Sequence, residues 1–285
     1  MPPLSLPPII GHRCARASAP ENTLAGLRRA AGMGVRWVEV DVRLTADGIP
    51  VLLHDETLDR TTNGQGALAD TTVEVLRRLD AGSWFDPAFA GETVPLLAEF
   101  LLVASDYGIG VNLELKGDCG DPNVLAALAL TTAASVWPGH KPPPLISSFD
   151  LPCLETAARI APDWPRGLLL ERIDQDWAGR AAEIDAACII IDHESITGAE
   201  SVAALGAGGR PVLTYTVNDP GRARYLYSIG ITAVITDRPD AGINNAVGVG
   251  FSEKYAIHGY LMTAPAPAGY DVLPDASGRP CPLPT

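Results

Sequence analysis

The chain has 285 residues, of which 47% are hydrophobic and 19% are charged, as in globular enzymes with a sizeable core. Its 21 basic and 34 acidic side chains give a formal net charge of −13, which disfavours nucleic acids and anionic membrane surfaces as partners. No stretch of about 20 apolar residues is present, so stable membrane insertion is not expected. The N-terminal MPPLSLPPIIGHR lacks the basic and long apolar segments of a signal peptide, which predicts a cytoplasmic protein. The five cysteines have no CxxC spacing and are expected to be free thiols.

Apolar runs of strand length alternate with segments of helix length along most of the chain. Eight runs are predicted to be strands, at residues 9–13, 37–43, 111–116, 144–149, 167–171, 188–192, 212–217 and 233–237. Helices are predicted at residues 22–33, 97–107, 123–135, 151–160, 201–207 and 221–229. Eight strand–helix units indicate an α/β fold of the (β/α)8 TIM-barrel type, in which active sites lie at the C-terminal ends of the strands.

Residues 50–55 depart from this alternation because only LTADG separates them from the second strand. So short a connection cannot contain a helix, and it predicts an antiparallel β-hairpin. If the turn centres on Ala46 and Asp47, His54 lies opposite Glu39. In the same register Leu52 lies opposite Asp41. A bulge at Gly48 would shift this pairing by one residue.

The predicted barrel domain spans residues 1–245 and carries one insertion. Residues 56–95 contain two segments rich in turn-forming residues, DRTTNGQG and DAGSWFDPAFAGE, around a short helical pattern at residues 72–79. They are predicted to form a lid or small subdomain over the barrel mouth. Residues 246–285 lack helical and strand periodicity, so we expect a flexible C-terminal tail, to which no function is assigned.

Acidic, basic and imidazole side chains gather at the ends of the predicted strands: His12, Glu39, Asp41, His54 and Glu114, with Arg13 and Lys116 beside them. Glu39 and Asp41 are two residues apart, so they point to one face of their strand, and Glu114 lies on the next barrel strand. Carboxylates can bind a hard cation, arginine and lysine can bind a phosphate, and imidazoles can exchange protons near neutral pH. The pattern indicates metal-assisted chemistry on a phosphate.

Each of these residue types also has a purely structural interpretation. Acids at strand ends often pair with arginines, and Arg13 and Lys116 could be surface cations. Asn22 or Thr23 could serve only to cap a helix. The histidines outside the strand-end group, His140, His193 and His258, are interpreted as structural. His193 follows a strand end and could still line the pocket.

Several motifs occur in a fixed order between roughly residues 9 and 240: GHR, APENT, VEVDVRLTADGIPVLLHD, LDRTTNGQG, LDAGSWFD, NLELKG, ISSFD, TVND and ITDRP. In this order they resemble the glycerophosphodiester phosphodiesterase family. The resemblance implies a barrel with a small insertion and a divalent cation, Mg or Ca. It also implies a small-molecule phosphodiester substrate, which is hydrolysed to glycerol 3-phosphate and an alcohol.

The resemblance assigns roles to individual residues. It implies that Glu39, Asp41 and Glu114 bind the metal, that His12 and His54 act as general acid and base, and that Arg13 and Lys116 bind the phosphate. Tyr215 stands where the family commonly has Trp and is expected to contact the substrate. Glu21, in APENT, is expected beside the metal or the catalytic residues, or in a supporting position. Cys14 replaces the glycine that usually follows HR, which leaves the local backbone conformation open.

Two other functions are compatible with the same motifs. A lysophospholipase D would need an apolar groove at the barrel mouth, which Trp84, Phe85 and Phe89 of the insertion could supply. A barrel that binds phosphodiesters without catalysis would not need both histidines and all three acids, so the sequence argues against it. The head group, the cation and the oligomeric state are not predicted.

Overall fold

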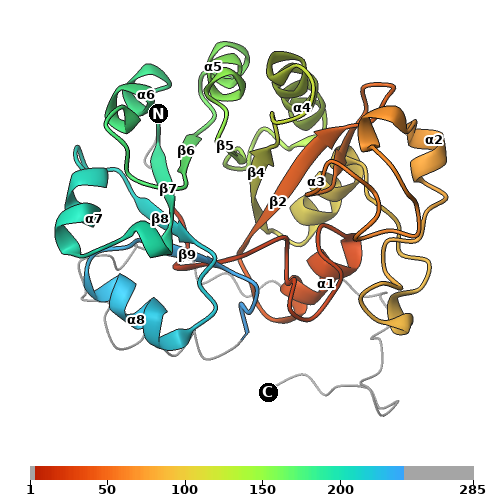
Figure 1. Ribbon diagram of the computed structural model, residues 1–285, viewed down its shortest axis with the longest axis horizontal. Coiled ribbons are helices and arrows are strands. Elements are labelled where there is room, and N and C mark those ends of the chain that lie inside the picture. The colour runs from red at the N-terminus through yellow and green to blue at the C-terminus, as the bar shows by residue number, and fades with distance from the viewer. Residues whose placement is uncertain (1–3, 241–285) are drawn as a thin grey trace. The chain divides into compact units, whose positions relative to one another are not determined.

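The computed structural model describes residues 4–240, so the predicted tail at 246–285 lies outside the described residues. Eight parallel strands form the barrel: β1 (Ile9–Gly11), β2 (Trp37–Leu44), β4 (Gly110–Leu115), β5 (Leu145–Ser148), β6 (Arg166–Leu170), β7 (Cys188–Asp192), β8 (Val212–Tyr215) and β9 (Ala233–Thr236). The sheet closes because β1 pairs with both β9 and β2. The predicted TIM barrel is therefore confirmed (Figure 1).

Helices follow most of the strands and surround the barrel (Figure 1). They are α1 (Leu24–Gly32), α3 (Leu97–Asp106), α4 (Pro122–Val136), α5 (Leu151–Ile160), α6 (Trp177–Glu183), α7 (Ala199–Leu205) and α8 (Pro220–Ser228). Only α6 was not predicted. It buries a single residue, Ala181, so its sequence shows little apolar periodicity. Within the described residues, no helix is both long and apolar enough to cross a bilayer.

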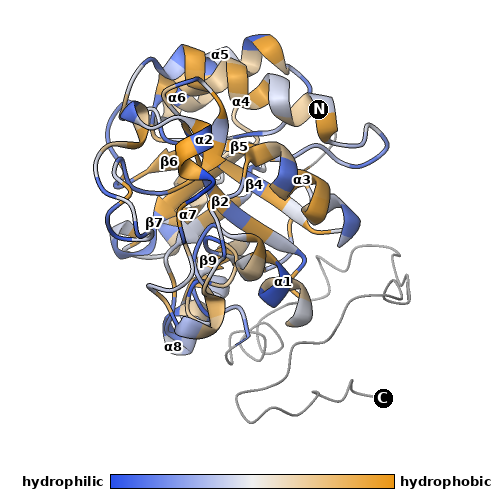
Figure 2. Cartoon of the chain, turned by 90° about the vertical axis from the view of Figure 1, so that its right-hand side faces the viewer, coloured by the Kyte–Doolittle hydropathy of each residue, from blue (hydrophilic) through white to orange (hydrophobic). Residues whose placement is uncertain are grey.

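Two layers of apolar side chains hold the barrel together. Alternate strand residues point inward and fill its interior, among them Ile10, Leu145, Leu169, Ile190 and Leu213. The intervening strand residues point outward and pack against the helices in the larger core. Figure 2 shows hydrophobic colour on most central strands and hydrophilic colour on the loops. Polar residues inside the barrel are therefore exceptions, and they mark the site.

The hairpin formed by β2 and β3 (Pro50–Leu52) has a different register from the one predicted. Leu52 lies opposite Val42, one residue later than the predicted partner Asp41. Gly48 causes the shift: its φ of +75° is the left-handed conformation that closes a three-residue turn, and its N–H donates to the Thr45 carbonyl at 2.9 Å. The predicted pairing of Glu39 with His54 is therefore wrong.

Residues 56–95 form a compact segment beside this hairpin. It contains α2 (Val73–Leu76) and two 3-10 turns, Leu68–Asp70 and Pro87–Phe89. Its leucines pack on Val51 and Leu53 of the hairpin. Glu92 Oε1 also accepts from the Ala25 N–H of α1 at 3.0 Å. The segment therefore rests on both the hairpin and the first helix.

Candidate active site

A tight turn after β1 sets the positions of the first site residues. Arg13 and Cys14 have φ values of +46° and +78°, in the left-handed region. Cys14 thus keeps a conformation that favours glycine, although it is fully buried. Gly11 is required because a Cβ there would lie 1.9 Å from the Cys14 carbonyl oxygen. The turn brings the Arg13 N–H to within 2.9 Å of Glu39 Oε2.

Three buried carboxylates converge above the barrel core. Glu39 and Asp41 come from β2, and Glu114 comes from β4, where it pairs in register with Asp41. One oxygen from each of the three lies within 4.8 Å of the others. Strand alternation and parallel register thus place all three predicted acids on one face.

Two cations and one amide hold Asp41 in its charged form. Lys116 Nζ lies 3.1 Å from Asp41 Oδ1 and also contacts Glu114 Oε1. Arg13 Nε lies 3.3 Å from Asp41 Oδ2, to which Asn22 Nδ2 donates at 2.8 Å. Burial alone would raise the pKa of Asp41, but the nearby charges of Lys116 and Arg13 lower it well below its usual range.

Glu39 has the opposite balance. Burial, together with the charges of Asp41 and Glu114, raises the pKa of Glu39 well above its usual value. Its Oε1 is buried and finds no hydrogen-bond donor among residues 4–240. An uncompensated carboxylate oxygen beside two further acids suits a hard divalent cation, which would supply the missing positive charge. The donor set therefore fits Mg or Ca.

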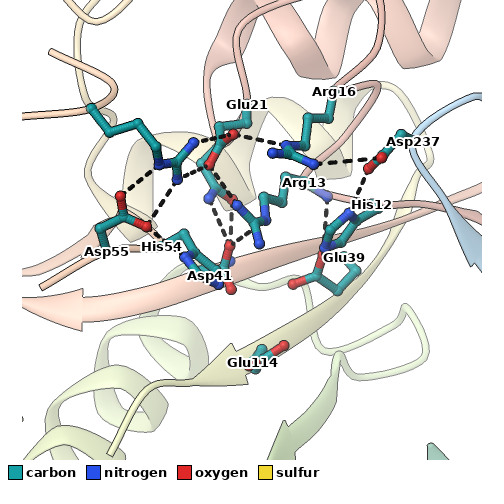
Figure 3. A network of polar contacts seen from close by, with 12 residues as sticks. His12, Arg13, Arg16, Glu21, Glu39, Asp41, His54, Asp55, Glu114 and Asp237 are labelled. Atoms are coloured by element: carbon teal, nitrogen blue, oxygen red, sulfur yellow. Dashed lines mark hydrogen bonds and ion pairs between the residues drawn. The ribbon is translucent and has the colours of Figure 1, made fainter. Parts of the chain in front are cut away.

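Each predicted histidine is hydrogen-bonded to an aspartate. His12 Nδ1 lies 2.6 Å from Asp237 Oδ1, and His54 Nδ1 lies 2.7 Å from Asp55 Oδ1. With Nδ1 bonded to a carboxylate, the Nε2 atom of each ring is left for chemistry. His12 Nε2 is 3.9 Å from Glu39 Oε2. Figure 3 shows both pairs beside the acids.

The surroundings of His54 differ from those predicted. Burial lowers the pKa of His54, while the negative charge of Asp41 opposes that shift. Of the three clustered acids, Asp41 is thus the one that acts on His54, whereas Glu39 is the neighbour of His12. Both histidines nonetheless lie at the same group of carboxylates.

Glu21 lies apart from the three acids, in a cage of arginines. Its side chain is only 2% exposed and accepts hydrogen bonds from Arg13, Arg16 and Arg60 at 2.7–2.9 Å. Burial would raise the pKa of Glu21, but the hydrogen bonds and charges of Arg60 and Arg13 lower it to about 2. Thr23 caps α1 by accepting from the Gly26 N–H, whereas the neighbouring Asn22 reaches Asp41. Of these two alternatives for a helix cap, Thr23 is the one that applies.

A cavity of about 30 Å³ lies beside the acids and is lined by His12, Glu39, Asn112, Glu114, Phe149, Leu169, Tyr215 and Ile235. Tyr215 and His12 both line it, and the substrate contact of Tyr215 stays a prediction. Its hydroxyl donates to the Leu170 carbonyl at 3.0 Å, and its ring meets Phe149 edge-on with centroids 6.0 Å apart. The tyrosine is thus fixed as an apolar wall.

The aromatic residues of the insertion and His193, which could have lined the pocket, do not line this cavity. Trp84 and Phe89 each pack edge-on against Phe85, with centroids 5.7 Å apart. The insertion rings therefore pack on one another and supply no lining here. His193 is held by Arg222, whose Nε lies 3.4 Å from its Nδ1. Its structural interpretation fits this contact.

Several residues of the network were not predicted: Arg16, Asp55, Arg60, Asn112, Phe149 and Asp237. Asp55 directly follows His54, and Asp237 ends the last predicted strand, so the motifs VLLHD and ITDRP contained both signals. Asn112 shares a strand face with Glu114. Nothing in the sequence pattern distinguishes Arg16 from other loop arginines.

Comparisons with known proteins agree on one family. The model of the glycerophosphoryl diester phosphodiesterase family matches residues 12–241. A glycerophosphodiester phosphodiesterase of Caldanaerobacter subterraneus is 33% identical over 238 residues, which cover 83% of this chain and 96% of that protein. The structure of an Oleispira antarctica phosphodiesterase in complex with the product sn-glycerol-3-phosphate superposes with a TM-score of 0.81 at 39% identity. The match covers 85% of this chain and 97% of the Oleispira chain. A glycerophosphodiester phosphodiesterase from Agrobacterium tumefaciens gives a TM-score of 0.68 at 32% identity, covering 82% and 98%.

Proposed function

Because the chain belongs to the glycerophosphoryl diester phosphodiesterase family, we propose that it hydrolyses glycerophosphodiesters to glycerol 3-phosphate and an alcohol. The observation that carries this proposal is the convergence of three buried acids with two histidine–aspartate pairs at one end of the barrel. The product complex of the Oleispira relative supports a glycerol phosphate as the ligand.

Glu39, Asp41 and Glu114 would hold a divalent cation, Mg or Ca. When bound, such an ion stabilises negative charge that develops on the phosphoryl oxygens. Arg13 and Lys116 already lie at the acids and add fixed positive charge for the phosphate. The planar arginine fork can bind two phosphate oxygens at once.

The two imidazoles share the proton transfers. Asp237 and Asp55 accept from Nδ1 of His12 and His54, which leaves both Nε2 atoms free of that proton. The base takes the proton of the attacking hydroxyl on its unprotonated Nε2. The acid starts with protons on both ring nitrogens and delivers its Nε2 proton to the alcohol oxygen as the bond from phosphorus to that oxygen breaks. The aspartates keep each ring in the tautomer and orientation that this exchange needs.

The direct test is a substrate panel with the purified protein. Glycerophosphocholine is expected to release glycerol 3-phosphate in the presence of Mg, Ca or Mn, and chelation with EDTA is expected to abolish the release. A lysophospholipid serves as the comparison substrate, because a lysophospholipase D would prefer it. Preference for the lysophospholipid, or turnover that survives EDTA, would contradict the proposal.

A further inference from the structure

Glu21 lies between the two histidine–aspartate pairs without touching either ring. Figure 3 shows contacts running from each aspartate through an arginine to this one carboxylate. The full chain of contacts is His12, Asp237, Arg16, Glu21, Arg60, Asp55 and His54. Every contact in it joins opposite charges or a ring nitrogen to a carboxylate.

The half of this chain that leads to His54 is the tighter one. Arg60 donates from Nε to Asp55 Oδ2 at 2.6 Å and from an Nη atom to Oδ1 at 2.9 Å. Its two Nη atoms also donate to both oxygens of Glu21, at 2.9 and 2.8 Å. A planar guanidinium held by two carboxylates has almost no freedom to rotate. Asp55 is therefore fixed while it holds His54.

The half that leads to His12 is looser. Arg16 Nε donates to Glu21 Oε2 at 2.9 Å, but its Nη1 reaches Asp237 Oδ2 only at 3.5 Å. Asp237 has a second support, because Asn218 Nδ2 donates to the same Oδ2 at 2.8 Å. Loss of Arg16 should therefore disturb His12 less than loss of Arg60 disturbs His54.

We propose that Glu21, Arg16 and Arg60 form one bridge that orients both imidazoles, so that Glu21 is a positioning residue for His12 and His54 together. The catalytic consequence rests on the proposed function, but the orientation itself does not. Buried Glu21 provides the fixed point, because its other contact, Arg13, ties it to the strand-end turn. Arg60 belongs to the insertion, so His54 is aligned only when the insertion is packed in its place beside the hairpin.

The first measurement is nitrogen NMR of the imidazoles in the full-length protein without substrate, with signals assigned from His12→Gln and His54→Gln. Both rings are expected to carry a proton on Nδ1, which faces the aspartate. Arg60→Gln is expected to shift the His54 signals and leave those of His12 unchanged. Arg16→Gln is expected to shift His12 alone, and by less, whereas Glu21→Gln should shift both rings.

Arg60 and Arg16 have half-exposed side chains, so their variants should fold even if Glu21→Gln does not. Arg78→Gln is the matched control: Arg78 is an exposed insertion arginine that pairs with Glu74, and its loss should move neither ring. Unchanged imidazole signals in both Arg60→Gln and Arg16→Gln would overturn the bridge, whatever the activity on phosphodiesters.

The second measurement separates positioning from substrate binding. If glycerophosphodiesters are turned over, Arg60→Gln is expected to lower kcat by about 10- to 100-fold with KM near that of the parent, as for other supporting residues. Combining it with Asp55→Asn should add little, because both changes act on His54. Additive losses in that double variant would contradict the bridge even if the phosphodiesterase function holds.

Discussion

Glu39 and Asp41 are two residues apart on one strand and equally buried, yet their environments drive their charges in opposite directions. Asp41 is bound by Lys116, Arg13 and Asn22, whereas among residues 4–240 the Glu39 side chain accepts a hydrogen bond only from the Arg13 N–H. Burial without compensation favours the protonated form of Glu39. Of these two acids, Glu39 is therefore the one whose negative charge is left uncompensated.

Glu39→Gln should abolish stabilisation by divalent cations without destabilising the metal-free protein. The substitution removes a ligand oxygen and replaces an acid whose charged form is already disfavoured by burial and by the charges of Asp41 and Glu114. At a cation concentration 100 times Kd, the parent should gain about 2.7 kcal/mol, visible as a rise in Tm that the variant lacks. Thermal unfolding with and without Mg or Ca measures both, and Asp106→Asn, an exposed α3 acid, is the control. An equal rise in Glu39→Gln would mean that Glu39 is not a ligand.

Alanine at either histidine should lower kcat by about 10²- to 10⁴-fold, the usual effect of removing a positioned proton-transfer group. A p-nitrophenyl phosphodiester, whose leaving group needs no proton, should restore the activity of the variant that lacks the acid and not that of the other. Steady-state kinetics of His12→Ala and His54→Ala on both substrates identifies the acid. Near-parent activity of either variant on glycerophosphocholine would contradict the paired mechanism.

At the scale of elements, the hairpin shows how one glycine determines a register. Gly48 closes the turn between β2 and β3 at φ +75°, and a Cβ there would meet only Leu128 Cδ1 at 3.5 Å. A substitution would thus be opposed by backbone conformation and not by crowding. The hairpin also carries Asp41 and His54, so its register decides which acid faces which ring.

Gly48→Ala should lower the free energy of unfolding by about 1–2 kcal/mol, the cost of a left-handed conformation for an L residue. Gly179→Ala in α6 is the control, since no atom outside its chain neighbours and its own helix backbone lies within 4 Å of its Cβ position and its φ is not positive. Alanine in a helix interior should stabilise by about 0.5–1 kcal/mol. Urea unfolding of both variants measures the contrast, and equal effects would show that the turn conformation is not strained.

For the whole molecule, sequence reasoning found what depends on local pattern. Barrel strands are buried on both faces, so they appear as continuous apolar runs such as CIIID, and all eight were located. The hairpin register was missed because it depends on the φ of Gly48. The partner of His12 was missed because Asp237 is 225 residues away and approaches only through strand closure. Asp55 was overlooked although it adjoins His54.

Glu21 links the loop after β1 to the insertion through Arg13, Arg16 and Arg60, so its ionisation should affect global stability. Its pKa falls from 4.5 to about 2, a shift worth about 3 kcal/mol at ~1.4 kcal/mol per unit. Because the folded pKa is depressed, this contribution is complete above about pH 4.5 and disappears as the pH falls through about 2. Urea unfolding should give the parent a higher free energy of unfolding than Glu21→Gln at pH 7, and this gap should be smaller at pH 3. A gap independent of pH would assign the loss to packing.

The two histidine–aspartate pairs also differ in when they can form. His54 and Asp55 are consecutive, and their supports Arg60 and Glu21 also lie before β4, so this pair depends only on the N-terminal part of the chain. His12 lies near the start of the chain, whereas Asp237 follows the last barrel strand. During synthesis from the N-terminus, His12 therefore cannot pair with Asp237 until almost the entire barrel has been made. An incompletely translated chain can hold one aligned imidazole but never both, so hydrolysis by this mechanism begins only after the barrel has closed.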